Sequence, residues 1–135
     1  MPSAIFVQRS RSALKDQESL RQAMRELLAK QRADGGWSDL DTMESSVFAT
    51  GKSLNALQLA GLPPSDPAYR QAVKFLLDTQ QEDGSWYVRS RAMGFQPYFD
   101  AGFPHGFDQW ISAAGTNWAT LALAQAYPVR TAMAK

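Results

Sequence analysis

A stretch of eighteen residues occurs twice in this chain, and this internal repeat restricts the possible folds more than any other feature. Residues 20–37 read LRQAMRELLAKQRADGGW and residues 69–86 read YRQAVKFLLDTQQEDGSW, with nine of the eighteen positions identical at a shift of 49. Such repeats are typical of folds built from copies of one supersecondary unit, each of which buries its apolar face against its neighbours.

Each copy begins with the pattern of an amphipathic helix. In the first copy the apolar residues recur at intervals of three and four and form one stripe, Leu20, Ala23, Met24, Leu27 and Leu28. The second copy repeats the stripe with Tyr69, Ala72, Val73, Leu76 and Leu77. Asp66 is a suitable N-cap for this second helix, and Pro67 suits its first position. We therefore expect two helices that each keep one face in water.

Each copy continues into a helix of another kind, with almost no charge. Residues 45–60 contain one charged residue, Lys52, and residues 111–127 contain none. Helices with so little charge are normally buried on most sides, and their many small residues let neighbouring helices approach closely. Asp41 and Glu44 have the spacing of a capping box for the first of these helices.

The order of these elements predicts an all-α fold, a partial α/α toroid of two helical hairpins with four main helices and a long aromatic loop before the last helix. The expected parts are an N-terminal extension (1–15), a first hairpin (16–61), a second hairpin (62–127) with an insert (87–108), and a C-terminal tail (128–135). A closed four-helix bundle is the alternative fold. In a toroid, two hairpins leave open flanks, which predicts exposed apolar surface that contacts remaining repeats or promotes self-association.

Charge and composition exclude several classes of function. The net charge of +1 is too small to indicate a nucleic acid partner. The chain has no cysteine, so thiolate chemistry and disulfides are excluded. No stretch reaches the roughly 18 apolar residues of a membrane-spanning helix, and no signal peptide pattern is present. The cytoplasm is therefore the default expectation, with the compartment of a longer parent protein left open.

The insert, residues 87–108, is the main departure from an even repeat. Its aromatic side chains suit a segment that caps the ring, gates an apolar ligand or binds a partner, and packing across the ring end is the alternative. Asp108 is expected to cap the last helix. His105, the one histidine, is expected to be a solvated loop residue. Without companions it cannot build a zinc site, so we expect no metal and no cofactor.

The repeated turn carries a family resemblance. The spacing of Gln31, Gly35 and Trp37 recurs at Gln80, Gly84 and Trp86, and it resembles the QW motif of terpene cyclases and related toroids. Glycine allows a tight turn, the indole offers a large packing face, and the glutamine amide can bond the backbone at a helix end. The GFPxxF pattern at residues 102–107 and the TLAL sequence at residues 120–123 are similar to the last repeat of squalene-hopene cyclases. The resemblance thus implies the C-terminal end of such a protein.

This resemblance implies a terminal repeat of a triterpenoid cyclase, an isomerase-type enzyme whose toroid encloses an apolar cavity for an isoprenoid ligand. Catalysis in that family begins when an aspartic acid of a DxDD motif protonates an alkene. The nearest sequence here, Asp39-Leu40-Asp41-Thr42, lacks the last acid. We therefore assign no catalytic residue to this chain and expect it to be inactive alone.

Four aromatic residues are candidates for the lining of that cavity. By position, Phe103 and Phe107 match aromatic residues of the family's terminal repeat, and Trp110 and Trp118 can fill the adjacent space. Their π faces could stabilise carbocations. The structural alternative is that all four are core aromatics. The rival function is a non-catalytic toroid-repeat module that binds a protein partner or an apolar ligand.

Overall fold

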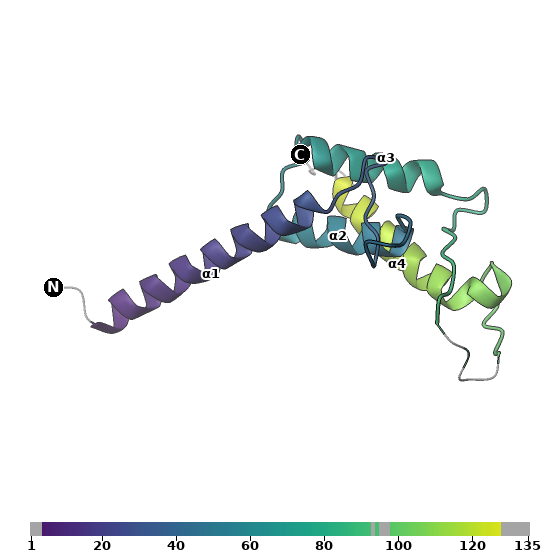
Figure 1. The fold of residues 1–135 in the computed structure, drawn as a ribbon, viewed down its shortest axis with the longest axis horizontal. Helices are drawn as coiled ribbons and strands as arrows, with labels where there is room; N and C mark the ends of the chain where they lie inside the picture. The colour runs from purple at the N-terminus through teal and green to yellow at the C-terminus, as the bar shows by residue number, and fades with distance from the viewer. Residues whose placement is uncertain (1–3, 93, 95–97, 128–135) are drawn as a thin grey trace, which may run out of the picture. The chain divides into compact units, whose positions relative to one another are not determined.

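The computed structural model describes residues 4–92, 94 and 98–127, and this part of the chain is all helix and loop (Figure 1). The helices are α1 (Ala4–Ala29), α2 (Val47–Leu59), α3 (Pro67–Thr79), the short 3-10 helix η1 (Gly106–Asp108) and α4 (Gln109–Ala126). The chain divides into two compact units, Met1–Lys30 and Gln31–Lys135. The first unit contains α1, and the second contains the other helices.

The predicted all-α class is confirmed, and four main helices without a strand in the described residues are consistent with a partial helical toroid. A closed four-helix bundle would need four main helices in one unit, whereas the described part of the second unit has three. Helix α1 runs without a break across the expected boundary between residues 15 and 16. The division of the chain into two hairpins remains a prediction.

Helix α2 begins two residues later than its expected start. Its N-cap is Ser46, whose hydroxyl accepts a hydrogen bond from the backbone N–H of Ala49 at 3.0 Å. The predicted capping box of Asp41 and Glu44 is therefore wrong, because both residues lie in the loop before Ser46. The loop ends in an isolated bridge between Trp37 and Ser46, and this pairing sets the start of the helix.

Helix α3 begins where the sequence predicts. The carboxylate of Asp66 accepts the backbone N–H of Ala68 at 2.8 Å, and Pro67 occupies the first helical position. A side-chain acceptor at the N-cap satisfies one of the free N–H groups of the first turn. The N-cap prediction for this helix is confirmed.

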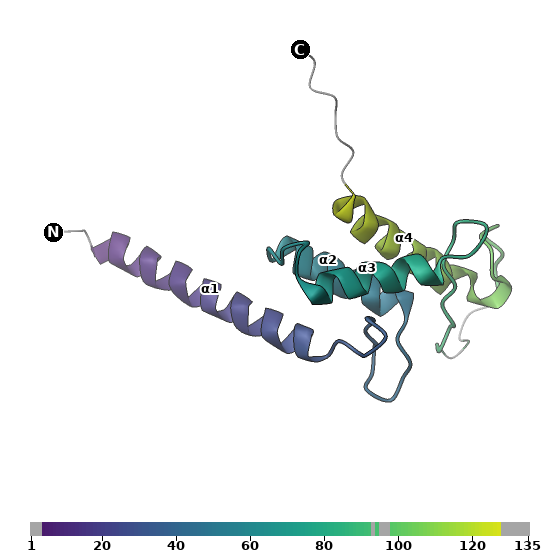
Figure 2. The ribbon, with the colours of Figure 1, turned by 90° about the horizontal axis from the view of Figure 1, so that it is seen from above.

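Helices α2, α3 and α4 form the core of the second unit (Figures 1 and 2). Helix α4 lies most extensively against α2, where Gly51 lets the backbones meet: a β-carbon on this residue would stand 2.8 Å from the carbonyl carbon of Trp118. Leu54 of α2 and Leu76 of α3 are fully buried. The two charge-poor helices are nevertheless not enclosed, since Leu59, at the end of α2, is 77% exposed.

Within the part of the chain that the structure describes, no helix combines the length and apolar character needed to cross a membrane.

Candidate functional site

The first of the two repeated turns contacts the start of helix α3. The side-chain N–H groups of Gln31 donate to two carbonyl oxygens, those of Gly35 and Ala68, each at 2.9 Å. Gly35 has a φ of +88°, a conformation that favours glycine. Trp37 is buried in the core of the unit. This turn therefore tethers its own loop to the first turn of α3.

The second turn repeats this geometry with one contact fewer. Gln80 donates to the carbonyl oxygen of Gly84 at 2.9 Å, and Gly84 has a φ of +83°. Trp86 is buried, and its indole N–H donates to the carbonyl oxygen of Leu76 at 2.7 Å. Gln80 is exposed and has no second acceptor among the described residues. The two turns thus differ in what lies next to them.

Each buried tryptophan is tied to the following charge-poor helix by a threonine, which the sequence analysis did not identify. The backbone N–H of Trp37 donates to the hydroxyl of Thr50 at 2.9 Å, and that of Trp86 donates to Thr116 at 3.0 Å. These pairs are 13 and 30 residues apart. Because these separations differ, the repeat of 49 residues does not align the two threonines. Only a separate alignment of α2 with α4 would pair them.

The insert is closed at its base by a buried serine of α4. The hydroxyl of Ser112 accepts the backbone N–H of Val88 at 2.9 Å and donates to the carbonyl oxygen of the same residue at 3.1 Å. Ser112 is fully buried and Val88 is buried. Val88 thus has both of its backbone polar groups satisfied by one side chain.

Asp108 holds the insert rather than the helix that follows it. Its carboxylate accepts the hydroxyl of Tyr87 at 2.7 Å and the backbone N–H of Ser90 at 2.9 Å. The Tyr87 hydrogen bond is the main reason that the pKa of Asp108 is lowered, and the same bond raises the pKa of the Tyr87 phenol. Asp108 occupies the N-cap position of α4 without a side-chain capping bond. The predicted capping role is wrong because the insert takes both carboxylate oxygens.

His105 is a structural contact and not the solvated residue expected from the sequence. It is half-buried, and its Nε2 lies 2.8 Å from the hydroxyl oxygen of Ser85. That hydroxyl donates to the carboxylate of Asp83 at 2.6 Å, which is the largest cause of the lowered pKa of Asp83. Since Ser85 uses its proton on Asp83, Nε2 of His105 acts as the donor to Ser85. The histidine thereby joins the insert to the second turn.

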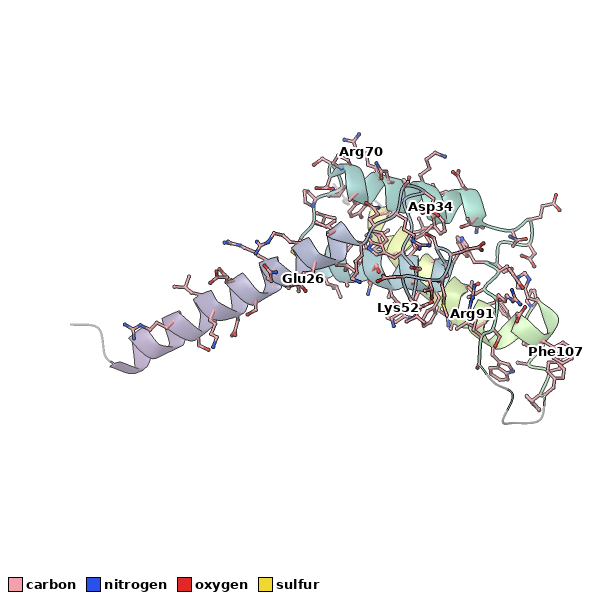
Figure 3. All side chains as sticks on the ribbon, in the orientation of Figure 1. Glu26, Asp34, Lys52, Arg70, Arg91 and Phe107 are labelled. Carbon is pink, nitrogen blue, oxygen red and sulfur yellow. The ribbon has the colours of Figure 1, made fainter. Side chains whose placement is uncertain are left out.

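The predicted cavity residues lie at different levels of exposure. Phe107 is 82% exposed and projects from the end of the unit (Figure 3). Trp110 is also exposed, whereas Phe103 and Trp118 are half-buried. Two further rings lie beside the exposed pair: Tyr98 is 4.7 Å from Phe107 and Phe99 is 6.3 Å from Trp110, between ring centroids. We call these four exposed rings, Tyr98, Phe99, Phe107 and Trp110, the aromatic surface.

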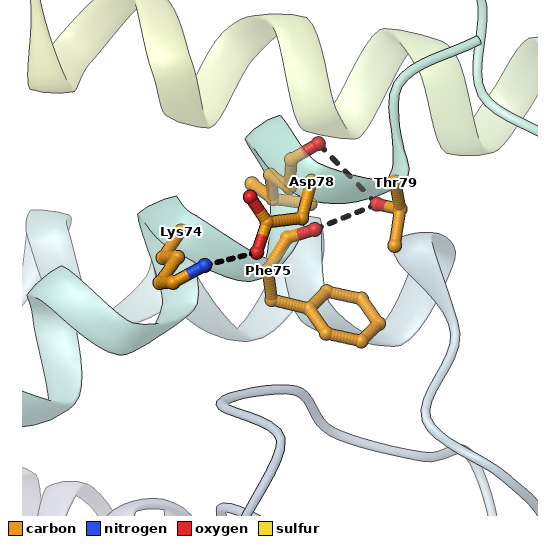
Figure 4. Close-up of polar contacts among 5 residues, drawn as sticks. Lys74, Phe75, Asp78 and Thr79 are labelled. Atoms are coloured by element: carbon orange, nitrogen blue, oxygen red, sulfur yellow. Dashed lines mark hydrogen bonds and ion pairs between the residues drawn. The ribbon is translucent and has the colours of Figure 1, made fainter.

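A groove of about 580 Å³ opens elsewhere on the same unit. Its apolar side includes Met43, Val47, Phe48, Phe75, Val88 and Ile111. Charged residues also line it, namely Arg89, Arg91, Asp39, Glu44 and Asp78. Asp78 pairs with Lys74, and the hydroxyl of Thr79 donates to the carbonyl oxygen of Phe75 at 2.7 Å (Figure 4). These contacts order the end of α3 where it borders the groove.

None of the four predicted cavity residues lines this groove. A second groove, of about 430 Å³ between α3 and the end of α4, is lined by Tyr69, Val73 and Leu77 and also excludes them. Among the described residues no group of three His, Asp or Glu side chains is arranged to hold a metal ion. The structure thus offers an apolar groove and an aromatic surface as separate candidate sites.

Comparison with known families identifies the protein class. Residues 2–79 match the family described as the squalene-hopene cyclase N-terminal domain, which is more than half of the chain. The chain belongs to this family. The matched residues include the first repeated turn, α2 and the whole of α3.

Three curated relatives are similar to part of this chain. A copalyl diphosphate synthase of Streptomyces cyslabdanicus is 40% identical over 62 residues, which is 46% of this chain and 12% of that protein. A squalene–hopene cyclase of Zymomonas mobilis is 29% identical over an alignment of 92 residues, and the alignment covers 54% of this chain and 14% of that protein. A labda-7,13-dienyl diphosphate synthase of Streptomyces clavuligerus is 36% identical over 62 residues, 46% of this chain and 11% of that protein. The aligned part of the chain therefore corresponds to about one eighth of the first two relatives.

The squalene-hopene cyclase match corrects the expected position of the chain within such a protein. The expected C-terminal placement is wrong, since the match is to the N-terminal domain. A helix and turn that recur along a protein look alike at every occurrence, so the two tryptophan turns could not specify which end they came from. The GFPxxF and TLAL sequences that suggested the C-terminal end lie at residues 102–123, outside the matched range.

Proposed function

We propose that this chain is part of an isoprenoid cyclase and forms a section of the helical wall around an apolar substrate site. The observation that carries this proposal is the family match over residues 2–79. Two relatives are named for a squalene–hopene cyclase and a copalyl diphosphate synthase, and both names denote isoprenoid chemistry. A cyclised isoprenoid is therefore the substrate class proposed for the protein to which this chain contributes.

The groove supports an apolar ligand. Its volume of about 580 Å³ lies in the range of small-molecule sites, and it combines an apolar side with a few charged groups. The alkyl and aromatic side chains of Val47, Phe48 and Ile111 suit a hydrocarbon chain. This groove is our first candidate for contact with substrate.

The aromatic surface is the second candidate. Phe107 and Trp110 are too exposed to act as core residues in this unit, so a covering ligand or protein segment is proposed for them. If the cover is substrate, then Phe103 and Trp118, which lie half-buried nearby in sequence, would extend the same aromatic lining. Aromatic faces attract cations, which suits a reaction through carbocations.

The chain is proposed to be inactive alone. Asp39-Leu40-Asp41-Thr42 lacks the last acid of the DxDD motif, and protonation of an alkene requires a well-placed carboxylic acid. Asp39 and Asp41 are both exposed, whereas such an acid needs an apolar surrounding that keeps it protonated. The catalytic acid is therefore assigned to a part of the enzyme beyond this chain.

A chimera tests the proposed function. The segment of the Zymomonas mobilis squalene–hopene cyclase that aligns with this chain would be replaced by the corresponding residues of this chain, and hopene formation from squalene would be measured by gas chromatography with mass spectrometry. Retained cyclisation is the expected result, because the wall section would be exchanged for an equivalent one. Phe48→Ser in the chimera should lower turnover by placing a hydroxyl beside the hydrocarbon.

Circular dichroism and thermal unfolding would show whether the chimera folds. A folded chimera that binds squalene but forms no product would contradict the proposal and favour the rival function, a non-catalytic toroid-repeat module that binds a protein partner or apolar ligand. Ala56→Ser is the matched control, because Ala56 is exposed on the same helix α2 and does not line the groove; its turnover should stay unchanged.

A further inference from the structure

The contacts of the two inner helices reveal a second repeat spacing. Thr50 of α2 and Thr116 of α4 make the same bond to the buried tryptophan that precedes each helix, so a shift of 66 residues maps α2 onto α4. Applied to the α2 residues that contact α4, this shift gives the equivalent residues on α4, which lie on the side of α4 that faces away from α2. It therefore predicts where the next helix of such a series would lie.

The joint between α2 and α4 has three well-defined contacts on its α2 side. Gly51 faces the backbone of Trp118, and Asn55 accepts a hydrogen bond from the side-chain amide of Gln125 at 2.8 Å. The amide of Gln58 donates to the carbonyl oxygen of Ala122 at 2.8 Å. Gly51 and Asn55 are buried by this packing, together with Leu54.

The equivalent positions on α4 are all uncovered. A shift of 66 residues carries the α2 side of the joint onto a stripe of four exposed residues, Asn117, Thr120, Leu121 and Ala124. We call this stripe the open α4 face. It contains no charged residue, and Leu121 is 44% exposed. A helix surface that is buried in one copy of a repeat is thus bare in the next.

The opposite side of the joint also has an uncovered equivalent. The α4 residues that contact α2 are Trp118, Ala119, Ala122 and Gln125. The same shift of 66 residues maps them onto four residues of α2, Lys52, Ser53, Ala56 and Leu59, which we call the open α2 face. All of these are exposed except Ser53, which is half-buried. The chain therefore carries both halves of a joint that it does not close.

The two open faces match each other at their largest apolar residues. The hydrogen-bonded pair of Asn55 and Gln125 corresponds to Leu121 on the open α4 face and Leu59 on the open α2 face. These two leucines are 44% and 77% exposed in this chain. A polar pair inside the unit is thus replaced by two bare leucines at its edges, and joining them would bury both from water.

The second turn, at Gln80 and Gly84, also lacks a neighbouring helix of the kind that α3 provides for the first turn, among the described residues. A β-carbon on Gly35 would stand 2.4 Å from the carbonyl oxygen of Gln71 in α3, whereas a β-carbon on Gly84 would meet nothing within 4 Å among the described residues. Within the same part of the chain, Gln80 lacks the second acceptor that Gln31 finds at Ala68. The position where an outer helix would pack is therefore open at the second turn.

We propose that the open α4 face, with the bare turn at Gln80 and Gly84, docks a second copy of this chain through that copy's open α2 face. The contact is head to tail, since the two faces differ, and such contacts propagate into rings or filaments rather than stopping at a dimer. In the joint between copies, Asn117 takes the place that Gly51 has in the joint between α2 and α4. Its side chain keeps the two backbones further apart, and this provides the space that two leucines need. This docking depends on the repeat geometry and not on cyclase activity.

Sedimentation velocity on the full chain tests the proposal. Over about 10 μM to 1 mM, where weak specific contacts become populated, the average mass of the wild-type chain should rise with concentration. Leu121→Glu and Leu59→Lys should each weaken this association by about tenfold or more, because a charge replaces a buried leucine. An equimolar mixture of the two variants should associate again, because the intact open α4 face of Leu59→Lys can dock on the intact open α2 face of Leu121→Glu.

Leu77→Glu is the matched control. Leu77 is 46% exposed, close to the value for Leu121, but lies on α3 outside the proposed joint, so this variant should associate like the wild type. A wild-type chain that stays monomeric across the whole range would overturn the proposal. Association that Leu77→Glu weakens as much as Leu121→Glu, or a mixture that fails to associate, would also overturn it, since either result indicates non-specific apolar contact.

Discussion

The α-carbon of Gly35 lies so close to Gln71 that a β-carbon at residue 35 would stand 2.4 Å from the carbonyl oxygen of residue 71. Gly84 has nearly the same positive φ, but a β-carbon there would meet no atom of the described residues within 4 Å. Gly84→Ala should therefore cost about 1–2 kcal/mol of the free energy of unfolding, from the left-handed conformation alone. Gly35→Ala should cost about 1–3 kcal/mol more, because α3 must also move.

Urea unfolding followed by circular dichroism would measure both variants of this pair. Equal losses for Gly35→Ala and Gly84→Ala would show that the turn at residue 35 does not pack against α3 in solution.

Ser112 is predicted to stabilise the insert through Val88. Ser112→Ala removes the partner of both backbone polar groups of a buried residue, so it should lower the free energy of unfolding by about 1–3 kcal/mol. Ser53→Ala, on a half-buried helical position, should change stability by less than about 0.5 kcal/mol. Amide hydrogen exchange at Val88 gives a second readout, since its protection should fall in Ser112→Ala alone.

The pair of Tyr87 and Asp108 should make stability depend on pH. The pKa of Asp108 is lowered in the folded chain, chiefly by the Tyr87 hydroxyl. A lowered carboxyl pKa contributes stability above the unfolded value of about 3.9, and this contribution is lost as the pH falls through the folded value. Asp108→Asn should therefore reduce the loss of stability on acidification below about pH 4.

Thermal unfolding as a function of pH would check this prediction, and Tyr87→Phe should show part of the same change. The raised pKa of Tyr87 adds an alkaline test: spectroscopic titration of the phenol should move to lower pH in Asp108→Asn. If Asp108→Asn loses as much stability on acidification as the wild type, the carboxylate does not hold the insert.

His105 is the only described non-glycine residue with a positive φ, 86°. His105→Ala keeps this conformation but loses the hydrogen bond to Ser85, whereas His105→Gly loses the same bond and relieves the backbone. His105→Gly should therefore be more stable than His105→Ala by about 1 kcal/mol. Guanidinium unfolding would rank the two, and the reverse order would show that the loop adopts another backbone conformation in solution.

The helices and turns could be predicted because their determinants are local. Apolar residues at intervals of three and four marked α3, and Asp66 with Pro67 marked its start. The start of α2 was missed because Ser46 and the Asp41 pattern are both valid caps, and only the pairing of Ser46 with Trp37 selects between them.

The contacts within the candidate site were less accessible to sequence analysis. Thr116 lies 30 residues from its partner Trp86, with the insert between them. Asp108 and His105 have partners 18–21 and 20 residues away, respectively, and these depend on how the insert closes. The N-terminal placement in the family could not be read from a turn that occurs twice in nearly the same form.

The buried bonds between Ser112 and Val88 have a practical meaning for protein engineering. These bonds hold Val88 and Ser112 against each other directly. The number of residues between them therefore does not have to match the distance between α3 and α4. Changes in the number of residues between Ser90 and Ala101, whose backbone N–H groups bond Asp108 and Gln109, should therefore leave α4 in place against α2.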